Sequence, residues 1–168
     1  MMKIIKNKTI VNDDWSVLRL VESDTPESVV VPNGKVIVPL KVWQAQGESL
    51  QSRSDIGVWL NSAERAEELQ DDIGKFAVIA VNFPKFADGR GYSIAYHLRV
   101  RLGYRGELRA IGDVLRDQMF YMQRVGFDTF EPREDKDINE ALKGLSDFFV
   151  VYQSSSDEPQ PLFRRIAR

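Results

Sequence analysis

Residues 76–83 read FAVIAVNF, and this almost unbroken apolar run decides how the rest of the chain is interpreted. A strand with one face in water alternates apolar and polar residues, whereas a strand covered on both faces does not. The run therefore predicts a central strand of a parallel sheet. Working outward, residues 90–102 carry apolar side chains at four-residue steps and end before Gly103, a pattern typical of a helix.

The same alternation of strand and helix continues in both directions. About five strand–helix units result, which predicts an α/β fold with a parallel sheet and right-handed crossovers. Chain order alone leaves two architectures open, an open doubly wound sheet and half of a (β/α)-barrel. The further strands are expected at 36–39, 57–60, 107–112 and 127–131, and the further helices at 40–46, 61–71, 113–125 and 137–148.

The two ends of the chain differ from this core. Residues 3–20 predict a β-hairpin with its turn at the polar cluster 12–14. The expected division is an N-terminal hairpin and connection at 1–34, an α/β core at 35–152 and a C-terminal tail at 153–168, forming a single domain overall. The tail ends in the basic run 164–168, and two interpretations of it are open, a flexible arm and a docking strip.

Composition excludes several classes of function. The chain has no cysteine and one histidine, which excludes disulfides, iron–sulfur clusters and cysteine nucleophiles and disfavours a zinc or copper site. Its formal net charge of −2 gives no field that would attract nucleic acid. No apolar run approaches the ~20 residues that span a bilayer, and no signal peptide is evident, so we expect a soluble cytoplasmic protein without a membrane partner.

The loop that follows the central strand is a candidate anion site. In parallel α/β folds, ligands bind beyond the carboxyl ends of the strands, where loops enter helices. Glycines allow a ligand to approach the backbone closely, and basic side chains would balance its charge. The alternative is an ordinary surface turn closed by an ion pair between Asp88 and Arg90. The expected ligand-binding residues of this loop are Lys85, Asp88, Gly89, Arg90, Gly91 and Ser93.

The next two loops offer acid–base candidates. Asp113 and Glu131 each stand at the end of a predicted strand, where a carboxylate could act as a general base. A plain helix cap is the alternative for Asp113, and a solvated turn is the alternative for the loop of Glu131. No metal site is expected, and flavin and nicotinamide stay open as cofactors, although the dinucleotide fingerprint is missing. Nearby charged residues that could also bind a ligand are Arg109, Arg116 and Asp117.

Several long motifs resemble one known family. The chain contains FPKFADGRGYS, then RLGYRGELRAIGDVLRDQ, then GFDTF, and near its end PLFRR. Together they resemble the DUF934 family of uncharacterised proteobacterial proteins, whose members are labelled probable oxidoreductases or proteins involved in sulfite reduction. The family offers no established catalytic residue. The residues that match its motifs are Lys85, Asp88, Arg90, Arg109, Asp113, Arg116 and Asp117.

The resemblance implies a pathway and leaves the activity open. We expect an accessory protein of assimilatory sulfite reduction, and hence of cysteine biosynthesis, that binds a small anion or sulfite reductase through its strand-to-helix loops. The first alternative is an oxidoreductase or other enzyme that uses Asp113 or Glu131 as acid–base. The second is a structural subunit without catalysis. Oligomeric state cannot be read from the sequence.

Overall fold

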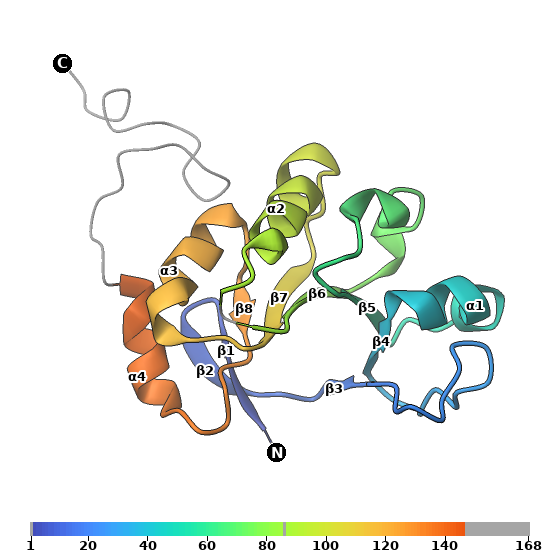
Figure 1. The fold of residues 1–168 in the computed structure, drawn as a ribbon, viewed down its shortest axis with the longest axis horizontal. Helices are drawn as coiled ribbons and strands as arrows, with labels where there is room; N and C mark the ends of the chain where they lie inside the picture. The colour runs from blue at the N-terminus through green and yellow to red at the C-terminus, as the bar shows by residue number, and fades with distance from the viewer. Residues whose placement is uncertain (1, 86, 147–168) are drawn as a thin grey trace.

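The chain folds around one curled sheet, and the computed structural model describes residues 2–85 and 87–146 of it. In chain order the strands are β1 (Lys3–Lys6), β2 (Thr9–Asn12), β3 (Ser16–Val17), β4 (Val36–Pro39), β5 (Ile56–Leu60), β6 (Val78–Phe83), β7 (Glu107–Gly112) and β8 (Thr129–Phe130). They lie side by side in the order β2-β1-β8-β7-β6-β5-β4-β3 (Figure 1).

The predicted α/β class is confirmed, but the sheet is mixed and not parallel throughout. Strands β3 to β8 are parallel to one another. Strand β1 runs antiparallel to both β8 and β2, because the N-terminal hairpin joins the sheet at the end of the parallel series. The hairpin therefore belongs to the same sheet as the core.

The connection between the two outermost strands shows why the sheet curls. Strands β2 and β3 are separated in sequence only by residues 13–15. Eight strands at a spacing of about 4.8 Å would place the edges of a flat sheet about 34 Å apart. The four peptide steps from Asn12 to Ser16 span at most about 14 Å. The sheet must bend into a half-barrel, and residues 13–15 cross its open side (Figure 1).

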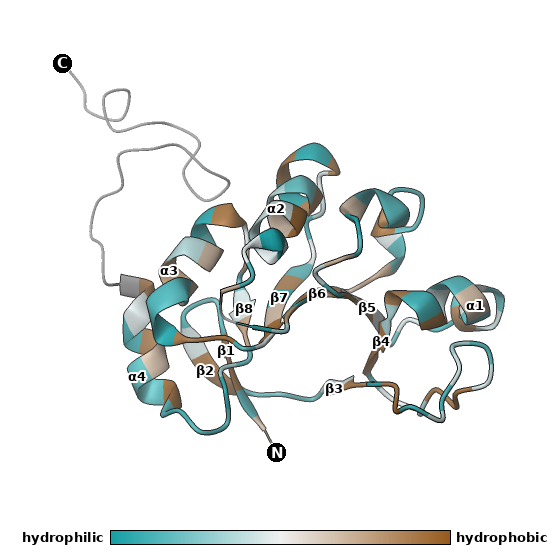
Figure 2. Ribbon diagram, in the orientation of Figure 1, coloured by the Kyte–Doolittle hydropathy of each residue, from teal (hydrophilic) through white to brown (hydrophobic). Residues whose placement is uncertain are grey.

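The helices all cover the outer, convex face of the sheet (Figure 1). Right-handed crossovers between neighbouring parallel strands, taken in chain order, place every helix on the same face. In Figure 2 the helices carry bands of both teal and brown, as expected of helices with one face on a core. They are α1 (Leu40–Leu50), α2 (Arg90–Tyr96) with a π-helical turn η3 (His97–Arg101), α3 (Arg116–Val125) and α4 (Ile138–Lys143).

Two apolar layers result, one on each side of the sheet. Val58, Ile79 and Leu108 face the helices and have no exposed surface. On the concave side, Ile37, Val78, Ala80 and Ile111 form a smaller cluster. Trp15 and Trp59 pack against this second cluster, so the segment that crosses the open side also covers it.

The turn of the N-terminal hairpin lies at Asn7 and Lys8, not at 12–14 as expected. Both residues have positive φ, 50° and 64°, as the two-residue turns that match the twist of a hairpin require. Residues 12–14 instead lead out of β2 toward β3. The sequence hides this turn because lysine seldom occupies the left-handed region.

The helix expected at 61–71 is wrong, since the chain forms a short 3₁₀ turn there, Ala66–Leu69, and a second one, Ile73–Lys75, just after it. The capping signal is real: the backbone N–H of Asn61 donates to Glu64 at 2.8 Å. The N–H of Arg65, however, donates to Glu68 at 2.9 Å, so a second cap starts a new turn four residues later. Two caps this close leave no room for one continuous helix.

The last helix is capped as predicted. Asp137 accepts a hydrogen bond from the backbone N–H of Asn139 at 2.9 Å, and α4 follows. Helix α4 ends at Lys143 and a 3₁₀ turn, Gly144–Ser146, comes next. The expected end of this helix at residue 148 and the tail at 153–168 lie outside the described residues.

Candidate functional site

The carboxyl ends of the parallel strands bring the candidate loops together. Strands β6 and β7 are paired so that Phe83 lies beside Gly112, and Arg109 of β7 lies beside Thr129 of β8. The loops that start at Pro84, Asp113 and Glu131 therefore leave the sheet side by side. We call this surface, formed by residues 61–65, 84–85, 87–93, 112–118 and 131–137, the carboxyl edge.

Arg90, which was predicted to bind an anion in the loop after β6, is instead paired with a carboxylate of the same loop. Arg90 donates to both carboxylate oxygens of Asp88, through Nε at 3.0 Å and through Nη2 at 2.8 Å. Arg90 Nη2 also donates to the hydroxyl of Ser62 at 3.0 Å. The Arg90 guanidinium holds the pKa of the Asp88 carboxyl well below its usual value. This is the surface ion pair that the sequence offered as the alternative to an anion cradle.

Gly91 has a packing role that the sequence did not reveal. A Cβ at this position would lie 2.6 Å from the ring of Phe83, so only glycine lets α2 approach β6 this closely. Gly89, by contrast, has open space around it. Lys85 and Ser93 are exposed at the same loop.

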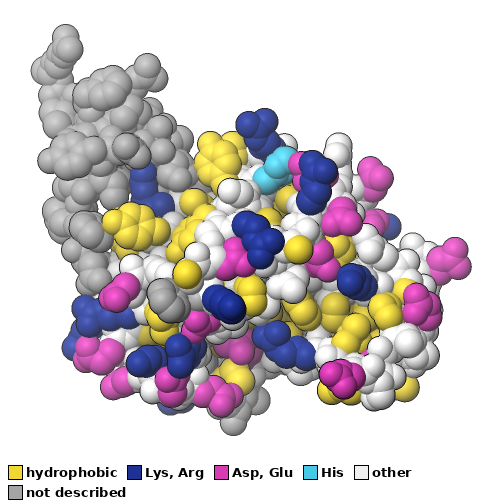
Figure 3. All heavy atoms as spheres, viewed as in Figure 1, with side chains coloured by type: hydrophobic (Ala, Val, Ile, Leu, Met, Phe, Trp, Pro, Cys, Tyr) yellow, Lys and Arg dark blue, Asp and Glu magenta, His cyan; other side chains and the backbone are white. Residues whose placement is uncertain are grey.

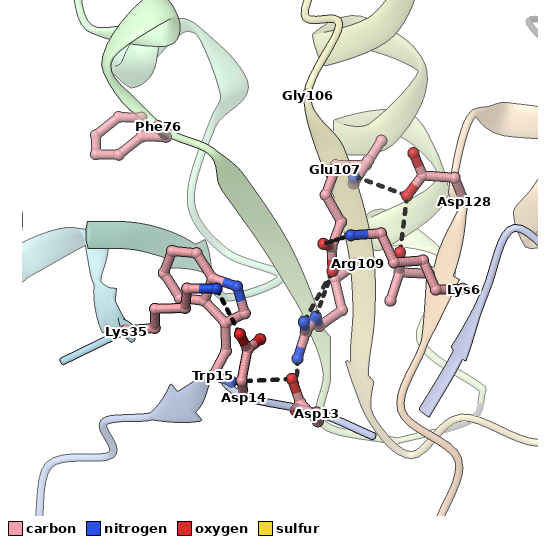
Figure 4. Close-up of polar contacts among 12 residues, drawn as sticks. Lys6, Asp13, Asp14, Trp15, Lys35, Phe76, Gly106, Glu107, Arg109 and Asp128 are labelled. Carbon is pink, nitrogen blue, oxygen red and sulfur yellow. Dashed lines mark hydrogen bonds and ion pairs between the residues drawn. The ribbon is translucent and has the colours of Figure 1, made fainter. Parts of the chain in front are cut away.

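Arg109 lies inside the curled sheet and not at its edge. Its side chain is 1% exposed and contacts two carboxylates, Asp13 at 2.8 Å and Glu107 at 2.8 Å (Figure 4). Lys6 pairs with the other oxygen of Glu107 at 2.8 Å. Burial alone would lower the pKa of Arg109, but Glu107 and Asp13 raise it above its usual value. The charge of Arg109 is thus balanced within the protein, and its pair with Asp13 ties the crossing segment to β7.

Asp113 and Glu131, the two acid–base candidates, stand on neighbouring strand ends around one arginine. Arg133 donates to Asp113 at 3.1 Å and to Asp135 at 2.9 Å. Asp113 does not cap α3, whose first residue is Arg116. Two shallow open hollows of about 550 and 380 Å³ adjoin here, and both are lined by Arg19, Gly112 and Arg133.

Glu131 is the one candidate acid whose carboxyl makes no hydrogen bond or ion pair with any residue that the structure describes. It is half-buried and lines the smaller hollow together with Arg19 and Arg133. Burial raises the pKa of Glu131, and the nearby charge of Arg109 opposes that rise only in part. A half-buried carboxyl with a raised pKa keeps its proton to a higher pH than an ordinary glutamate does, which suits it to proton transfer.

The raised pKa of Glu131 makes a prediction about stability. Below the usual pKa of glutamate the carboxyl is neutral in both the folded and the unfolded chain. As pH rises the unfolded chain loses its proton first, so stability falls across the interval that ends at the raised pKa of the folded protein. Glu131→Gln removes this loss. The stability of the variant relative to the parent should therefore increase as pH rises above about 4 and level off once the folded parent has lost its proton, measured by urea unfolding. A constant difference would contradict the raised pKa.

The remaining predicted residues lie apart from these hollows. Arg116, at the start of α3, pairs with Glu140 of α4 at 3.3 Å. Asp117 is exposed in the first turn of α3, and both residues line a separate hollow between α3 and α4. The residues that sequence reasoning placed together are therefore divided between four places, namely the loop after β6, the interior, the hollows around Arg133 and the α3–α4 hollow.

Arg19 belongs to the site and was not predicted. It follows β3, more than sixty residues from the loops it joins. Its guanidinium lies over the ring of Trp59 at 5.4 Å, and it lines both hollows at the carboxyl edge. No local pattern in the sequence signals this position, because only the curl of the sheet brings the segment after β3 beside β7 and β8.

Within residues 2–85 and 87–146, no group of three or more His, Cys, Asp or Glu side chains is arranged to hold a metal ion. In the same ranges no helix has both the length and the apolar character needed to cross a membrane.

Comparisons with known proteins identify one family. The model of a family described as "Bacterial protein of unknown function (DUF934)" matches residues 57–163, which is more than half of the chain. The matched region begins in β5 and includes every loop of the carboxyl edge. No curated protein and no solved structure matched the chain.

Proposed function

The chain belongs to the DUF934 family, and from this premise we propose that it is a cytoplasmic accessory protein of assimilatory sulfite reduction that binds sulfite reductase through its carboxyl edge. The motifs quoted from the sequence support the pathway, because they are the ones that resemble proteins labelled in that way. The ion pairs that the charged side chains of the carboxyl edge already form support binding of a protein partner at this edge.

The observation that carries the proposal is that the arginines of this edge are bound by carboxylates of neighbouring residues. Arg90 is held by Asp88, and Arg133 is held by Asp135 and Asp113. A small anion would have to displace these carboxylates, whereas a protein partner can meet both charges of each pair. Side chains already fixed in place lose less entropy when a partner binds. Shallow open hollows also suit a protein surface better than a small molecule.

The distribution of charge agrees with a protein partner. Figure 3 shows basic and acidic side chains interleaved over the face it views, without a large region of one sign. Such a pattern gives specificity and orientation rather than general attraction to polyanions. Lys85 adds an exposed positive charge to the loop after β6.

Binding to sulfite reductase can be tested with charge-reversal variants. We expect the purified protein to bind sulfite reductase from the same bacterium in a biosensor assay. Replacing Lys85 and Arg90 together by glutamate should weaken binding by about tenfold or more, since two charges change sign at the contact. The matched control is Arg101→Glu, which reverses an exposed arginine on η3, before β7 and away from the carboxyl edge.

Two results would contradict the proposal. One is the absence of any binding between the unmodified protein and sulfite reductase. The other is equal binding by the parent and the double variant, which would show that the carboxyl edge is not the contact.

A second candidate function is catalysis at the same edge, and Glu131 is the observation that favours it. Its carboxyl has a raised pKa and lies in a hollow with Arg19 and Arg133. In this role Glu131 would transfer a proton while the arginines stabilise developing negative charge. A flavin absorption band in the purified protein, or turnover of a pathway intermediate that Glu131→Gln abolishes, would favour this function over docking alone.

A further inference from the structure

A further hollow among the described residues lies at the opposite end of the sheet, where β7 and β8 begin. Its volume is about 580 Å³, within the range of small-molecule sites. The β1–β2 turn forms one wall, and the segments that precede β7 and β8 form the others. The backbone N–H of Asn7 donates to the carbonyl of Asp128 at 2.9 Å, which joins the turn to the entry of β8. We call this end of the sheet the amino edge.

The charges around this hollow differ from those of the carboxyl edge. Lys8, Arg99 and Arg105 line it, and Asp128 is the only carboxylate among the described residues of its lining. Arg99 is fully engaged, since it donates to Asp128 at 2.9 Å and to three backbone carbonyls. At the carboxyl edge, by contrast, two arginines face four carboxylates, namely Asp113, Glu131, Glu134 and Asp135.

Two of these cations are not neutralised by the part of the protein that the structure describes. The side chains of Lys8 and Arg105 make no hydrogen bond or ion pair with any residue in that part, and both are exposed at the rim. Arg105 also lines a second hollow of about 470 Å³, which shares Asp128 with the first. The amino edge is therefore where an anionic group would meet positive charge that is not already paired.

The walls of the hollow are apolar below this charged rim. Phe127 and Phe130 lie within it and are 2% and 1% exposed, while Val100 at the rim is 49% exposed. Gln123 also lines it, and its Oε1 atom is buried without a hydrogen-bond partner among the described residues. A buried acceptor without a donor destabilises a protein, so a ligand that supplies a donor would bind more tightly there.

We propose that the amino edge binds a small amphipathic anion, with an aromatic or aliphatic body against Phe127 and Phe130 and a carboxylate, sulfonate or phosphate between Lys8 and Arg105. The site is independent of the carboxyl edge, because it shares no lining residue with the hollows there. The sequence predicted an anion site in the loop after β6, and this proposal puts an anion site at the amino edge instead.

Two fluorescent dyes separate the apolar and charged parts of this proposal. The anionic dye anilinonaphthalene sulfonate should bind the full-length protein saturably, with one molecule per chain. Replacing Lys8 and Arg105 together by glutamine should weaken this binding by about tenfold, which corresponds to about 1.4 kcal/mol. The neutral analogue phenylnaphthylamine, which lacks the sulfonate, should bind the parent and this double variant within about twofold of each other, since it makes no ionic contact.

Two further variants guard against effects on folding. Val100→Glu places a negative charge on an exposed position of the rim and should weaken binding of the anionic dye without changing the melting temperature. Arg65→Gln removes an arginine whose side chain is 75% exposed at the carboxyl edge and should leave binding unchanged. The proposal is overturned if binding is not saturable at one dye per chain. It is also overturned if the double variant binds the anionic dye as the parent does, or if the neutral dye weakens equally.

Discussion

Replacing Arg109 by methionine is expected to lower the free energy of unfolding by about 3–5 kcal/mol, because a buried carboxylate loses its cation. Arg109 is 1% exposed and is the only cation paired with Asp13 within the described residues. Asp13 keeps a hydrogen bond from the backbone N–H of Trp15, at 3.1 Å, but its charge would no longer be balanced. Since Asp13 lies where the chain crosses the open side of the half-barrel, its release should loosen that closure. Urea unfolding followed by circular dichroism measures the loss.

The matched control for this variant is Lys6→Met. Lys6 belongs to the same cluster, but its side chain is 44% exposed, so its pair with Glu107 is expected to contribute about 1 kcal/mol or less. Adding Asp13→Asn to Arg109→Met should recover part of the stability, because it removes the unpaired charge. The interpretation of the cluster fails if Arg109→Met and Lys6→Met unfold at the same urea concentration.

Gly112→Ala is expected to cost about 3 kcal/mol or more, through strain and a backbone clash together. Gly112 has a φ of +90°, a region that other residues rarely occupy. A Cβ there would lie 2.5 Å from the carbonyl oxygen of Phe83 and 2.6 Å from the side-chain oxygen of Asn82. Neither the carbonyl nor the strand that carries it can move freely, since the N–H of Asp113 donates to that carbonyl at 2.7 Å. Thermal unfolding of the purified variant tests the expectation.

Gly89→Ala is the control on the neighbouring loop. Gly89 has a φ of −82°, and no heavy atom lies within 4 Å of the place that an alanine Cβ would take. Alanine should therefore be tolerated there or stabilise the protein by about 0.4–1 kcal/mol. Equal effects of the two substitutions would mean that the geometry around Gly112 is not a requirement of the fold.

Local patterns in the sequence predict most of the regular elements, but they wrongly predict a helix at 61–71 and do not predict the closure of the sheet. The apolar run at 76–83 and the alternation around it predict the parallel strands, because burial on both faces leaves a direct mark on composition. The hairpin turn at Asn7 and Lys8 leaves no such mark, since neither residue is the glycine that usually signals it. The curl of the sheet depends on the short connection at 13–15, whose length has meaning only once the strand order is known.

The same holds for the candidate site, whose loops could be located from local patterns although the contacts between them could not. The loops at 84–93 and 113–117 could be found because they follow recognisable strands. The partners of their charged groups could not, because Arg109 meets Asp13 across ninety-six positions of sequence and Arg19 reaches the hollows only through the curl. A row of basic residues in a sequence does not show which of them are already paired. In this protein Arg90, Arg109 and Arg133 are paired, and Lys8 and Arg105, which the sequence did not single out, carry the amino-edge site.

Hydrogen exchange of the protein with and without sulfite reductase tests directly whether this partner binds at the carboxyl edge or at the amino edge. Binding through the carboxyl edge predicts slower exchange in residues 84–93 and 112–118, with no change at 99–106, which border the amino edge. Unchanged exchange in all three segments, or protection confined to 99–106, would contradict the proposed docking surface.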